Sequence, residues 1–311
     1  MNNIKYTFLL PAYKARFFEE ALLSIKNQTY TDFKVIVSDD CSPEDLKSIY
    51  DKVCSDDPRF TFRRNEENMG SKSLVSHWNL LVDMCDTEFF IMASDDDVYE
   101  SQFLEEIDKL TIKYPNIDLY RSGVHAIDIK GEIFESETNK VEFANRFTFI
   151  RKWYKKDFIT CIANYCYRTM IVKQNNGFVS FPKAWFTDDA TNIIISQKGY
   201  ANTKENLFRF RKSEINISGR YGNATECAQK TLATIEFYKW INSYFDNCII
   251  NVPYSEIHEL IISKIKRNIN NNIFHCSLLN FIYLVYIIPD KIGLNKFRMC
   301  IHYTRILSHK I

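Results

Sequence analysis

Residues 87–97, TEFFIMASDDD, join a short apolar run to three consecutive aspartates. A run of this kind predicts a buried β-strand, so the aspartates follow at its carboxyl end. Residues 33–40, FKVIVSDD, repeat the arrangement with a second strand and an aspartate pair. The elements predicted around these two are strands at 5–10 and 60–64 and helices at 17–25 and 71–84. This alternation predicts an α/β fold with a mostly parallel sheet flanked by helices, whose ligands bind beyond the carboxyl ends of the strands.

The pattern changes along the rest of the chain. Further elements are predicted as strands at 119–129 and 132–135 and a helix at 190–196. From Ala224 onward the pattern is helical. We therefore predict a first domain over residues 1–222, with halves at 1–100 and 101–222, and a helical C-terminal region over residues 223–311.

Composition excludes several classes of protein. The 311 residues carry 40 Lys and Arg against 39 Asp and Glu, so no global basic face is available for a nucleic acid. The nine cysteines include no C-x-x-C pair, which predicts reduced thiols rather than a disulfide framework or a zinc site. The first residues lack a signal-peptide pattern, and the apolar stretch Leu278–Ile288 is shorter than the roughly 20 residues needed to cross a bilayer. We expect a cytoplasmic protein with no nucleic-acid partner.

The aspartates at the strand ends suggest a site for a charged ligand. Adjacent carboxylates disfavour one another's ionisation, and a divalent cation relieves this; oxygen ligands suit Mg²⁺ or Mn²⁺. An isolated triplet such as Asp95–Asp97 is more often a solvated turn, but its place beside a second strand-end pair favours the cation. The pair Asp39-Asp40 has two open interpretations, the cap of a helix that begins near Ser42 or an acceptor for a nucleotide base or ribose.

A third pair, Asp188-Asp189, lies in an aromatic stretch before a predicted helix. Thr187 or Asp188 is expected to cap that helix if the pair is structural. An aspartate near aromatic groups also fits a general base that acts on a hydroxyl. Common alternatives lack their motifs, since the sequence has no G-x-G-x-x-G after the first strand, no G-x-x-x-x-G-K-[ST] and no G-x-S-x-G.

Taken in order, the motifs over about residues 4–220 resemble the inverting family 2 glycosyltransferases with a GT-A fold. The segments that carry the resemblance are Pro11-Ala12-Tyr13-Lys14, Ser24–Thr29, Val37–Ser42, Asn68-Met69-Gly70 with Asn79, Ser94–Tyr99, Asp188-Asp189 and Arg209–Ser218. The chain departs from the family pattern at several positions. Lys14 stands where Asn is usual, Cys41 where Gly is usual, Ala93 where many members have an acid, and Ser213 where some members have a metal-contacting His.

The resemblance implies roles for individual residues. The residues implied at the nucleotide are Pro11, Ala12, Tyr13, Asp39, Asp40, Gly70, Asp95 and Arg211. Among these, Asp40 would accept a hydrogen bond from the base, and Arg211 would meet the diphosphate leaving group. The residues implied at a Mn²⁺ or Mg²⁺ cofactor are Asp95, Asp96 and Asp97, with Asp96 as the principal ligand. Asp189, beside Asp188, would remove the proton of the acceptor hydroxyl.

The same resemblance implies an activity and its setting. A sugar would pass with inversion from a nucleotide-sugar, most commonly a UDP-sugar, to a glycan or a lipid-linked saccharide, most commonly in bacterial surface polysaccharide synthesis. In this interpretation residues 1–100 bind the donor and residues 101–222 the acceptor. Two alternatives stay open, a sugar nucleotidyltransferase and a non-catalytic relative that binds a nucleotide-sugar.

The C-terminal region has its own charge pattern. From Ser263 to Ile311 it carries eight Lys and Arg, one acidic residue (Asp290) and interleaved aromatic residues. This pattern indicates peripheral contact with the anionic inner face of a membrane. The alternative is a helical appendage packed on the catalytic domain or on a second subunit of a homo-oligomer.

Overall fold

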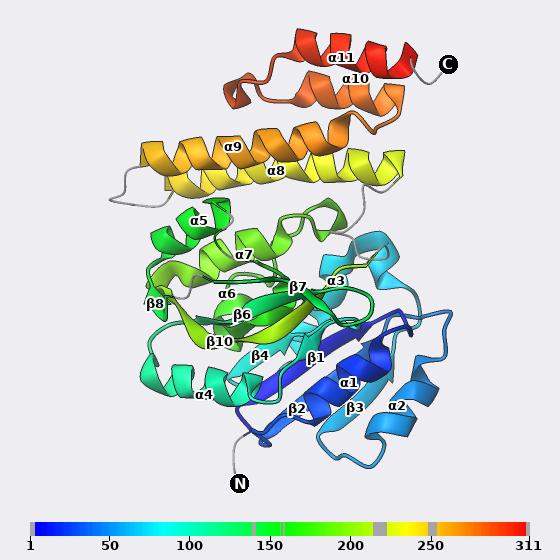
Figure 1. The fold of residues 1–311 in the computed structure, drawn as a ribbon, viewed down its shortest axis with the longest axis vertical. Coiled ribbons are helices and arrows are strands. Elements are labelled where there is room, and N and C mark those ends of the chain that lie inside the picture. The colour runs from blue at the N-terminus through cyan, green and yellow to red at the C-terminus, as the bar shows by residue number, and fades with distance from the viewer. Residues whose placement is uncertain are drawn as a thin grey trace. The chain divides into compact units, whose positions relative to one another are not determined.

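The computed structural model describes residues 4–138, 141–155, 157, 159–213, 223–247 and 254–308 (Figure 1). The chain divides into two compact units. The first comprises Met1–Ser180 and Thr187–Ser213, and the second comprises Phe181–Phe186 and Glu214–Ile311. The domain boundary predicted at residue 222 lies outside the described residues and stays a prediction.

The first unit is built on one sheet with helices on both of its faces (Figure 1). Its strands are β1 (Tyr6–Ala12), β2 (Phe33–Asp39), β3 (Phe60–Arg64), β4 (Phe89–Met92), β5 (Val98–Tyr99), β6 (Leu119–Ile127), β7 (Ile133–Ser136), β8 (Phe143–Ala144), β9 (Tyr165–Arg168) and β10 (Tyr200–Arg211). Its helices and short 3-10 turns are α1 (Phe18–Lys26), α2 (Leu46–Cys54), α3 (Met69–Met84), α4 (Phe103–Lys113), α5 (Arg146–Lys155), η1 (Ile162–Asn164), α6 (Thr169–Gln174), α7 (Thr187–Ile195) and η3 (Ser196–Lys198).

The strands follow the order β3-β2-β1-β4-β9-β6-β10-β5, with β7 paired to β6 and β8 to β10. The pairs from β3 to β4 are all parallel, as the alternation predicts. Beyond β4 the sheet is mixed, because β9 runs antiparallel to both β4 and β6 while β10 runs parallel to β6. The predicted parallel sheet therefore describes the first hundred residues better than the rest of the unit.

The registers of β1 align the strand ends that carry the acidic residues. Tyr6 is level with both Phe33 of β2 and Phe89 of β4, and at the other end Ala12 is level with Asp39. Two backbone hydrogen bonds extend these ladders past the strands, from Asp40 N to Ala12 O (2.9 Å) and from Ala93 N to Leu9 O (2.8 Å). All three carboxyl ends therefore meet at one edge of the sheet.

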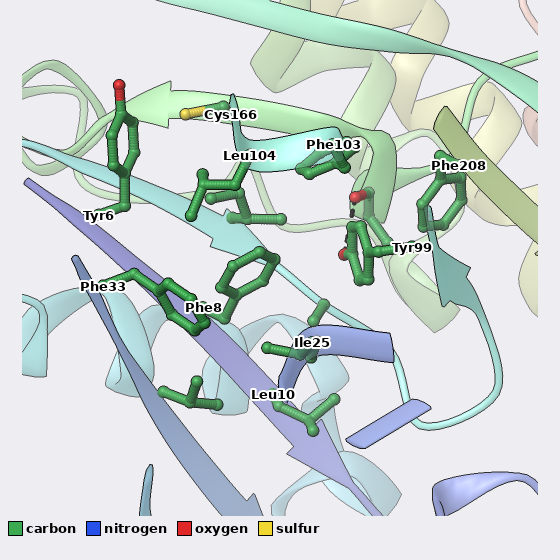
Figure 2. Close-up of a cluster of buried hydrophobic side chains, with 14 of the residues drawn as sticks. Tyr6, Phe8, Leu10, Ile25, Phe33, Tyr99, Phe103, Leu104, Cys166 and Phe208 are labelled. Carbon is green, nitrogen blue, oxygen red and sulfur yellow. Dashed lines mark hydrogen bonds between the residues drawn. The ribbon is translucent and has the colours of Figure 1, made fainter. Parts of the chain in front are cut away.

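An aromatic core covers the face of the sheet that packs on α1 and α4 (Figure 2). Phe8 is fully buried and lies edge-on to Phe33 and Tyr99, with ring centroids 5.5 and 5.3 Å apart. Tyr99 in turn packs against Phe208 of β10 at 5.0 Å, and its hydroxyl donates to Ala163 O at 2.9 Å. Aromatic pairs of this kind add about 0.5–1.5 kcal/mol each beyond their buried area. The core therefore holds the short β5 strand, and the acidic residues just before it, against the sheet.

One predicted helix start is wrong. The spacing of Ser42, Pro43 and Asp45 predicts a helix capped by Ser42, but α2 begins at Leu46 with Asp45 as its N-cap, which accepts from Ser48 N at 3.1 Å. Ser42 is held elsewhere, because its N–H donates to Asp39 Oδ1 at 2.8 Å and its hydroxyl donates to Tyr13 O at 2.6 Å. These two bonds tie the loop to the strand ends instead of to the helix.

The second unit is helical, as predicted from Ala224 onward. Its elements are η2 (Pro182–Ala184), α8 (Ala224–Asn247), α9 (Tyr254–Ile273), α10 (Leu278–Ile287), η4 (Asp290–Ile292) and α11 (Lys296–Ser308). Phe186 stacks on Phe237 of α8 with centroids 4.5 Å apart, and Phe281 of α10 stacks on Tyr303 of α11 at 3.9 Å. Among the helices of the described residues, none is both long and apolar enough to span a membrane.

Candidate active site

The loop after β1 is bonded directly to the first aspartate after β4. The backbone N–H groups of Tyr13 and Lys14 both donate to Asp95 Oδ2, each at 2.8 Å. Two parallel strands that neighbour each other in the sheet bring these segments together, although 82 positions separate Tyr13 from Asp95 in the sequence. Tyr13 itself is 40% exposed. The structure thus joins two of the predicted nucleotide-site segments at the sheet edge and leaves the Tyr13 ring accessible.

Asp39 and Asp40 are buried, and each is held by a different loop. Asp39 accepts from Ser42 N and forms an ion pair with Arg64, its neighbour in register on β3. Asp40 accepts from the Asn65 side chain at 2.8 Å and from the backbone N–H groups of Met69 (2.9 Å) and Gly70 (2.7 Å). Asp40 therefore holds the 65–70 loop and the start of α3, whereas Asp39 joins the turn at Ser42 to the end of β3.

Two positions in this region depend on backbone shape. A Cβ added to Gly70 would lie 2.9 Å from Asp40 Oδ2, so the absence of a side chain lets the Gly70 N–H approach the carboxylate. Cys41 has φ +54°, a left-handed conformation that favours glycine. The family pattern has glycine at this position, and the chain keeps that backbone shape with a cysteine.

Lys14 is bound to the acidic residues after β4. Its Nζ lies 2.8 Å from Asp96 Oδ2 and 3.4 Å from Asp95 Oδ1. Burial lowers the pKa of Lys14, but the two carboxylates outweigh that effect and raise it to about 12. Burial raises the pKa of Asp95 and also that of Asp97, and the Asp96 charge raises both further. The ammonium therefore supplies a positive charge within a cluster that burial would otherwise drive toward protonation.

Asp97 has a different environment from its two neighbours. Its Oδ1 accepts from Arg211 N at 2.8 Å, and its other carboxylate oxygen accepts from the Ser94 hydroxyl. The Arg211 guanidinium donates to Asp96 O (2.9 Å), to Asp128 O (3.1 Å) and to Glu20 Oε2 (2.6 Å), and it is 1% exposed. The hydrogen bonds of Arg211 thus hold the end of β10 against Asp96 and Asp97. Contact of Arg211 with a diphosphate stays a prediction.

Asp188 and Asp189 occupy the first turn of α7, which begins at Thr187. The expectation that Thr187 or Asp188 caps this helix is therefore wrong, since both lie inside it. Acidic side chains in a first turn are stabilised by the positive end of the helix dipole. Both aspartates are half-buried. Burial raises the pKa of the Tyr165 phenol, and both carboxylates add to that shift.

The charges of both acidic groups act on one thiol, that of Cys161. Burial raises the pKa of Cys161 well above its ordinary value, and the charges of Asp97 and Asp188 both add to the increase. Both charges therefore act on the same thiol, which lies just before η1.

Sequence reasoning missed Arg64 and Asn65 as partners of the aspartate pair. A signal for Arg64 existed, because the predicted strands at 33–38 and 60–64 end together if they pair in parallel. The Ile217-Ser218 part of the resemblance lies outside the described residues. Ser213, where some members have a metal-contacting His, is buried at the end of the first unit.

The oxygen ligands at this edge of the sheet suit a divalent ion only in part. Within the described part of the chain, no three His, Cys, Asp or Glu residues are grouped so that they could hold a metal. Both carboxylate oxygens of Asp97 already accept hydrogen bonds, one from the Ser94 hydroxyl and one from Arg211 N. Asp95 Oδ2 accepts from two backbone N–H groups. Asp96 and one oxygen of Asp95 remain, which suits an ion bound mainly through substrate phosphates. The Lys14 ammonium contacts that Asp95 oxygen and one of the two Asp96 oxygens.

Comparison with known proteins identifies similar sequences. The family model "Glycosyl transferase family 2" matches residues 7–174. A glycosyltransferase of Methanocaldococcus jannaschii is 27% identical over 51% of this chain and 53% of its own length. The teichoic acid poly(glycerol phosphate) polymerase of Staphylococcus epidermidis is 23% identical over 86% of this chain and 36% of its own length. The GalNAc(5)-diNAcBac-PP-undecaprenol β-1,3-glucosyltransferase of Campylobacter jejuni is 31% identical over 30% of each chain. The matches thus span about half or less of these relatives.

Solved structures support the fold. S. aureus TarS 1–349 in complex with UDP-GlcNAc superposes with a TM-score of 0.67 at 16% identity, covering 93% of this chain and 82% of that one. The mannosyltransferase PcManGT from Pyrobaculum calidifontis, in complex with GDP-Man and Mn²⁺, gives a TM-score of 0.56 at 14% identity over 91% and 79%. These likenesses confirm the predicted α/β fold of GT-A type with a helical C-terminal region.

Proposed function

The chain belongs to glycosyl transferase family 2, and we propose that it moves a hexosyl or N-acetylhexosaminyl group from a UDP-sugar to a hydroxyl of a glycan or lipid-linked saccharide. The observation that carries this proposal is the convergence at one sheet edge of the Tyr13–Lys14 loop and Asp95, whose Oδ2 accepts from both backbone N–H groups of that loop. Relatives named for teichoic acid and undecaprenol-linked substrates support an acceptor of this class. Bacterial surface polysaccharide synthesis is the setting we propose.

In the proposed reaction Asp189 accepts the proton of the acceptor hydroxyl. The hydroxyl oxygen forms a bond to the anomeric carbon while the bond from that carbon to the diphosphate breaks, and the nucleoside diphosphate leaves with the electron pair. A single displacement without a carboxylate nucleophile inverts the anomeric configuration. Holding the two substrates in line contributes a large part of the rate. Pro11, Ala12 and Tyr13 would line the base and ribose, with Asp39, Asp40 and Gly70 shaping the same pocket.

The proposed cofactor is Mn²⁺ or Mg²⁺, which Asp96 and the Oδ1 atom of Asp95 would hold together with the diphosphate. When bound, such an ion supplies positive charge to the leaving group. The Mn²⁺ of the PcManGT complex supports a metal in proteins of this fold. Asp97 would act by positioning, through its bonds to Ser94 and Arg211.

Thermal unfolding with nucleotides tests the donor site. We expect UDP at about 100 times its dissociation constant to stabilise the folded protein by about 2.7 kcal/mol, a shift of several degrees, with a larger shift when Mn²⁺ is present. GDP, CDP and ADP serve as matched controls because they carry the same diphosphate. A shift that is equal for all four would contradict base recognition, and no shift with any of them would contradict the donor site itself.

We also propose peripheral contact between the second unit and an anionic membrane. One face of α10 is apolar and exposed, with side chains 51% to 81% accessible; the face consists of Leu278, Leu279, Ile282, Tyr283 and Tyr286. Phe297 at the start of α11 is 75% exposed. The described residues from Ser263 onward contain seven Lys and Arg and a single acid, Asp290. Two copies of so basic a region repel each other, so an anionic lipid surface fits better than a second copy of the chain.

Sedimentation with vesicles tests the membrane contact. The wild-type protein is expected to sediment with vesicles that contain phosphatidylglycerol. It should not sediment with vesicles of neutral phosphatidylcholine. A Leu279→Ser/Tyr286→Ser variant should lose about tenfold or more in partitioning, because it removes two exposed apolar groups from the proposed interface. An Ile112→Ser/Met170→Ser variant is the control, since those side chains are 69% and 65% exposed in the first unit. Equal losses in both variants would contradict a specific role for α10.

A further inference from the structure

We propose that Lys14 is a resident cation of the acidic edge: it competes with a divalent ion for Asp95 and Asp96 in the free protein and contacts the diphosphate when the donor binds. The first part concerns the free protein alone. The second part rests on the proposed function, because it needs a nucleotide at this edge.

The contacts of Lys14 place its ammonium among the oxygens that an ion would need. Its Nζ lies 2.8 Å from Asp96 Oδ2 and 3.4 Å from Asp95 Oδ1. Asp96 has no other side-chain partner in the described part of the chain, and Asp95 Oδ2 is occupied by two backbone N–H groups. A divalent ion that is to bind both Asp95 and Asp96 in the free protein must therefore compete with the lysine, which contacts one oxygen of each carboxylate.

The loop geometry keeps the lysine at this place. The backbone N–H of Lys14 donates to the same Asp95 whose other oxygen faces its ammonium, so main chain and side chain are anchored to one carboxylate. Both carboxylates are nearly buried, with side-chain exposures of 7% and 9%, whereas the Lys14 side chain is 31% exposed. The Lys14 side chain is thus the more exposed member of the cluster, and solvent or a phosphate group reaches it more readily than the carboxylates.

An ammonium and a divalent ion supply the same kind of interaction to a diphosphate, positive charge close to the leaving oxygens. Lysine acts as a compact point charge with several rotatable bonds, so it can turn from a carboxylate to a phosphate without backbone movement. The structure therefore predicts a protein that binds a nucleoside diphosphate without added metal. It also predicts that metal binding depends on the nucleotide, which provides the missing ligands.

Titration of free protein with Mn²⁺, followed by the electron paramagnetic resonance signal of unbound ion, tests the competition. Lys14→Asn is expected to bind Mn²⁺ about tenfold more tightly than wild type, because one positive charge leaves the cluster. Lys14→Arg should behave like wild type, since it keeps the charge. Lys5→Asn is the matched control, because Lys5 also pairs with an aspartate at 2.9 Å and its side chain is 25% exposed. Equal Mn²⁺ affinity in Lys14→Asn and wild type, or equal gains in Lys14→Asn and Lys5→Asn, would overturn the proposal.

A second measurement tests the contact with the diphosphate. In the presence of EDTA, UDP should raise the unfolding temperature of wild type and of Lys5→Asn but not that of Lys14→Asn, and Mn²⁺ should restore the shift in Lys14→Asn. A shift that survives in Lys14→Asn with EDTA would overturn this part. If UDP shifts no variant under any condition, the proposed donor site fails, while the Mn²⁺ titration still decides whether Lys14 competes with metal.

Discussion

Asp189→Asn is expected to lower kcat for sugar transfer by about 10²- to 10⁴-fold, the usual contribution of a positioned general base, while leaving UDP-sugar binding unchanged. Asparagine has nearly the shape of aspartate but does not take up a proton at neutral pH. Binding should persist because Asp189 is in the first turn of α7, whereas the proposed nucleotide contacts come from the strand ends. Transfer is measured from release of the nucleoside diphosphate, and binding from the thermal shift.

Asp188→Asn provides the matched control. Asp188 lies in the same first turn and is half-buried like Asp189, so both substitutions remove one charge from the same helix terminus. That loss costs about 0.3–1 kcal/mol of stability in either variant. A specific base role predicts a much larger loss of kcat for Asp189→Asn than for Asp188→Asn. The reverse order would assign the proton transfer to Asp188, and full activity in both variants would remove the pair from the chemistry.

Glu137→Gln is expected to lower the free energy of unfolding more than any other substitution proposed for this protein. Glu137 forms a paired contact with Arg121 on β6, with both oxygen–nitrogen distances at 2.8 Å, and the two side chains are 0% and 1% exposed. Removing one charge of a buried pair leaves the other uncompensated, which costs about 3–5 kcal/mol. For a unit of this size that corresponds to a fall of about 6–20 °C in the unfolding temperature. Calorimetry or far-UV circular dichroism during heating measures it.

Glu135→Gln is the control for this substitution. Glu135 lies on β7 and pairs with Lys212 at 3.5 Å, but both side chains are about half exposed, at 55% and 50%. Exposed pairs contribute about 0–1 kcal/mol, so the unfolding temperature should hardly change. Replacing both members of the buried pair, as in Arg121→Met/Glu137→Met, should recover much of the loss because no isolated charge is left. A Glu137→Gln protein as stable as Glu135→Gln would contradict the assigned role of the pair.

The sequence predicted the fold best in the part of the chain where strands and helices alternate. The strands from β1 to β4 and their parallel direction were predictable, because β1, β2 and β4 are mostly apolar runs and helical segments separate the four strands. The placement of β9 was not, since Tyr165–Arg168 is a short strand that inserts antiparallel between β4 and β6. No local pattern encodes which distant strands will accept it. The Ser42 cap failed for a related reason, as Asp39 captures the Ser42 N–H only once β2 ends beside the loop.

The candidate site, too, was predictable from the sequence only in part. The segments that meet at the sheet edge were predictable as a set, because parallel strands place their carboxyl ends together. The individual hydrogen bonds and ion pairs between these segments were not predictable. The departure at Lys14 was visible in the sequence, but its ion pairs with Asp95 and Asp96 depend on the register of β1 and β4. The roles of these residues toward donor, metal and acceptor stay predictions, which the substitutions and titrations described above test.

The position of β1 in the sheet has a consequence for how the chain is made. Its residues from Tyr6 to Leu10 are completely buried, and its two neighbours are β2 and β4, the latter ending at Met92. During synthesis this apolar strand leaves the ribosome before β4 has been made, and both of its edges are covered only after β4 has followed. Unpaired apolar strand edges promote aggregation at this stage. Residues through Met92 must therefore be translated before both edges of this central strand are paired, and until then pairing with β2 covers only one of them.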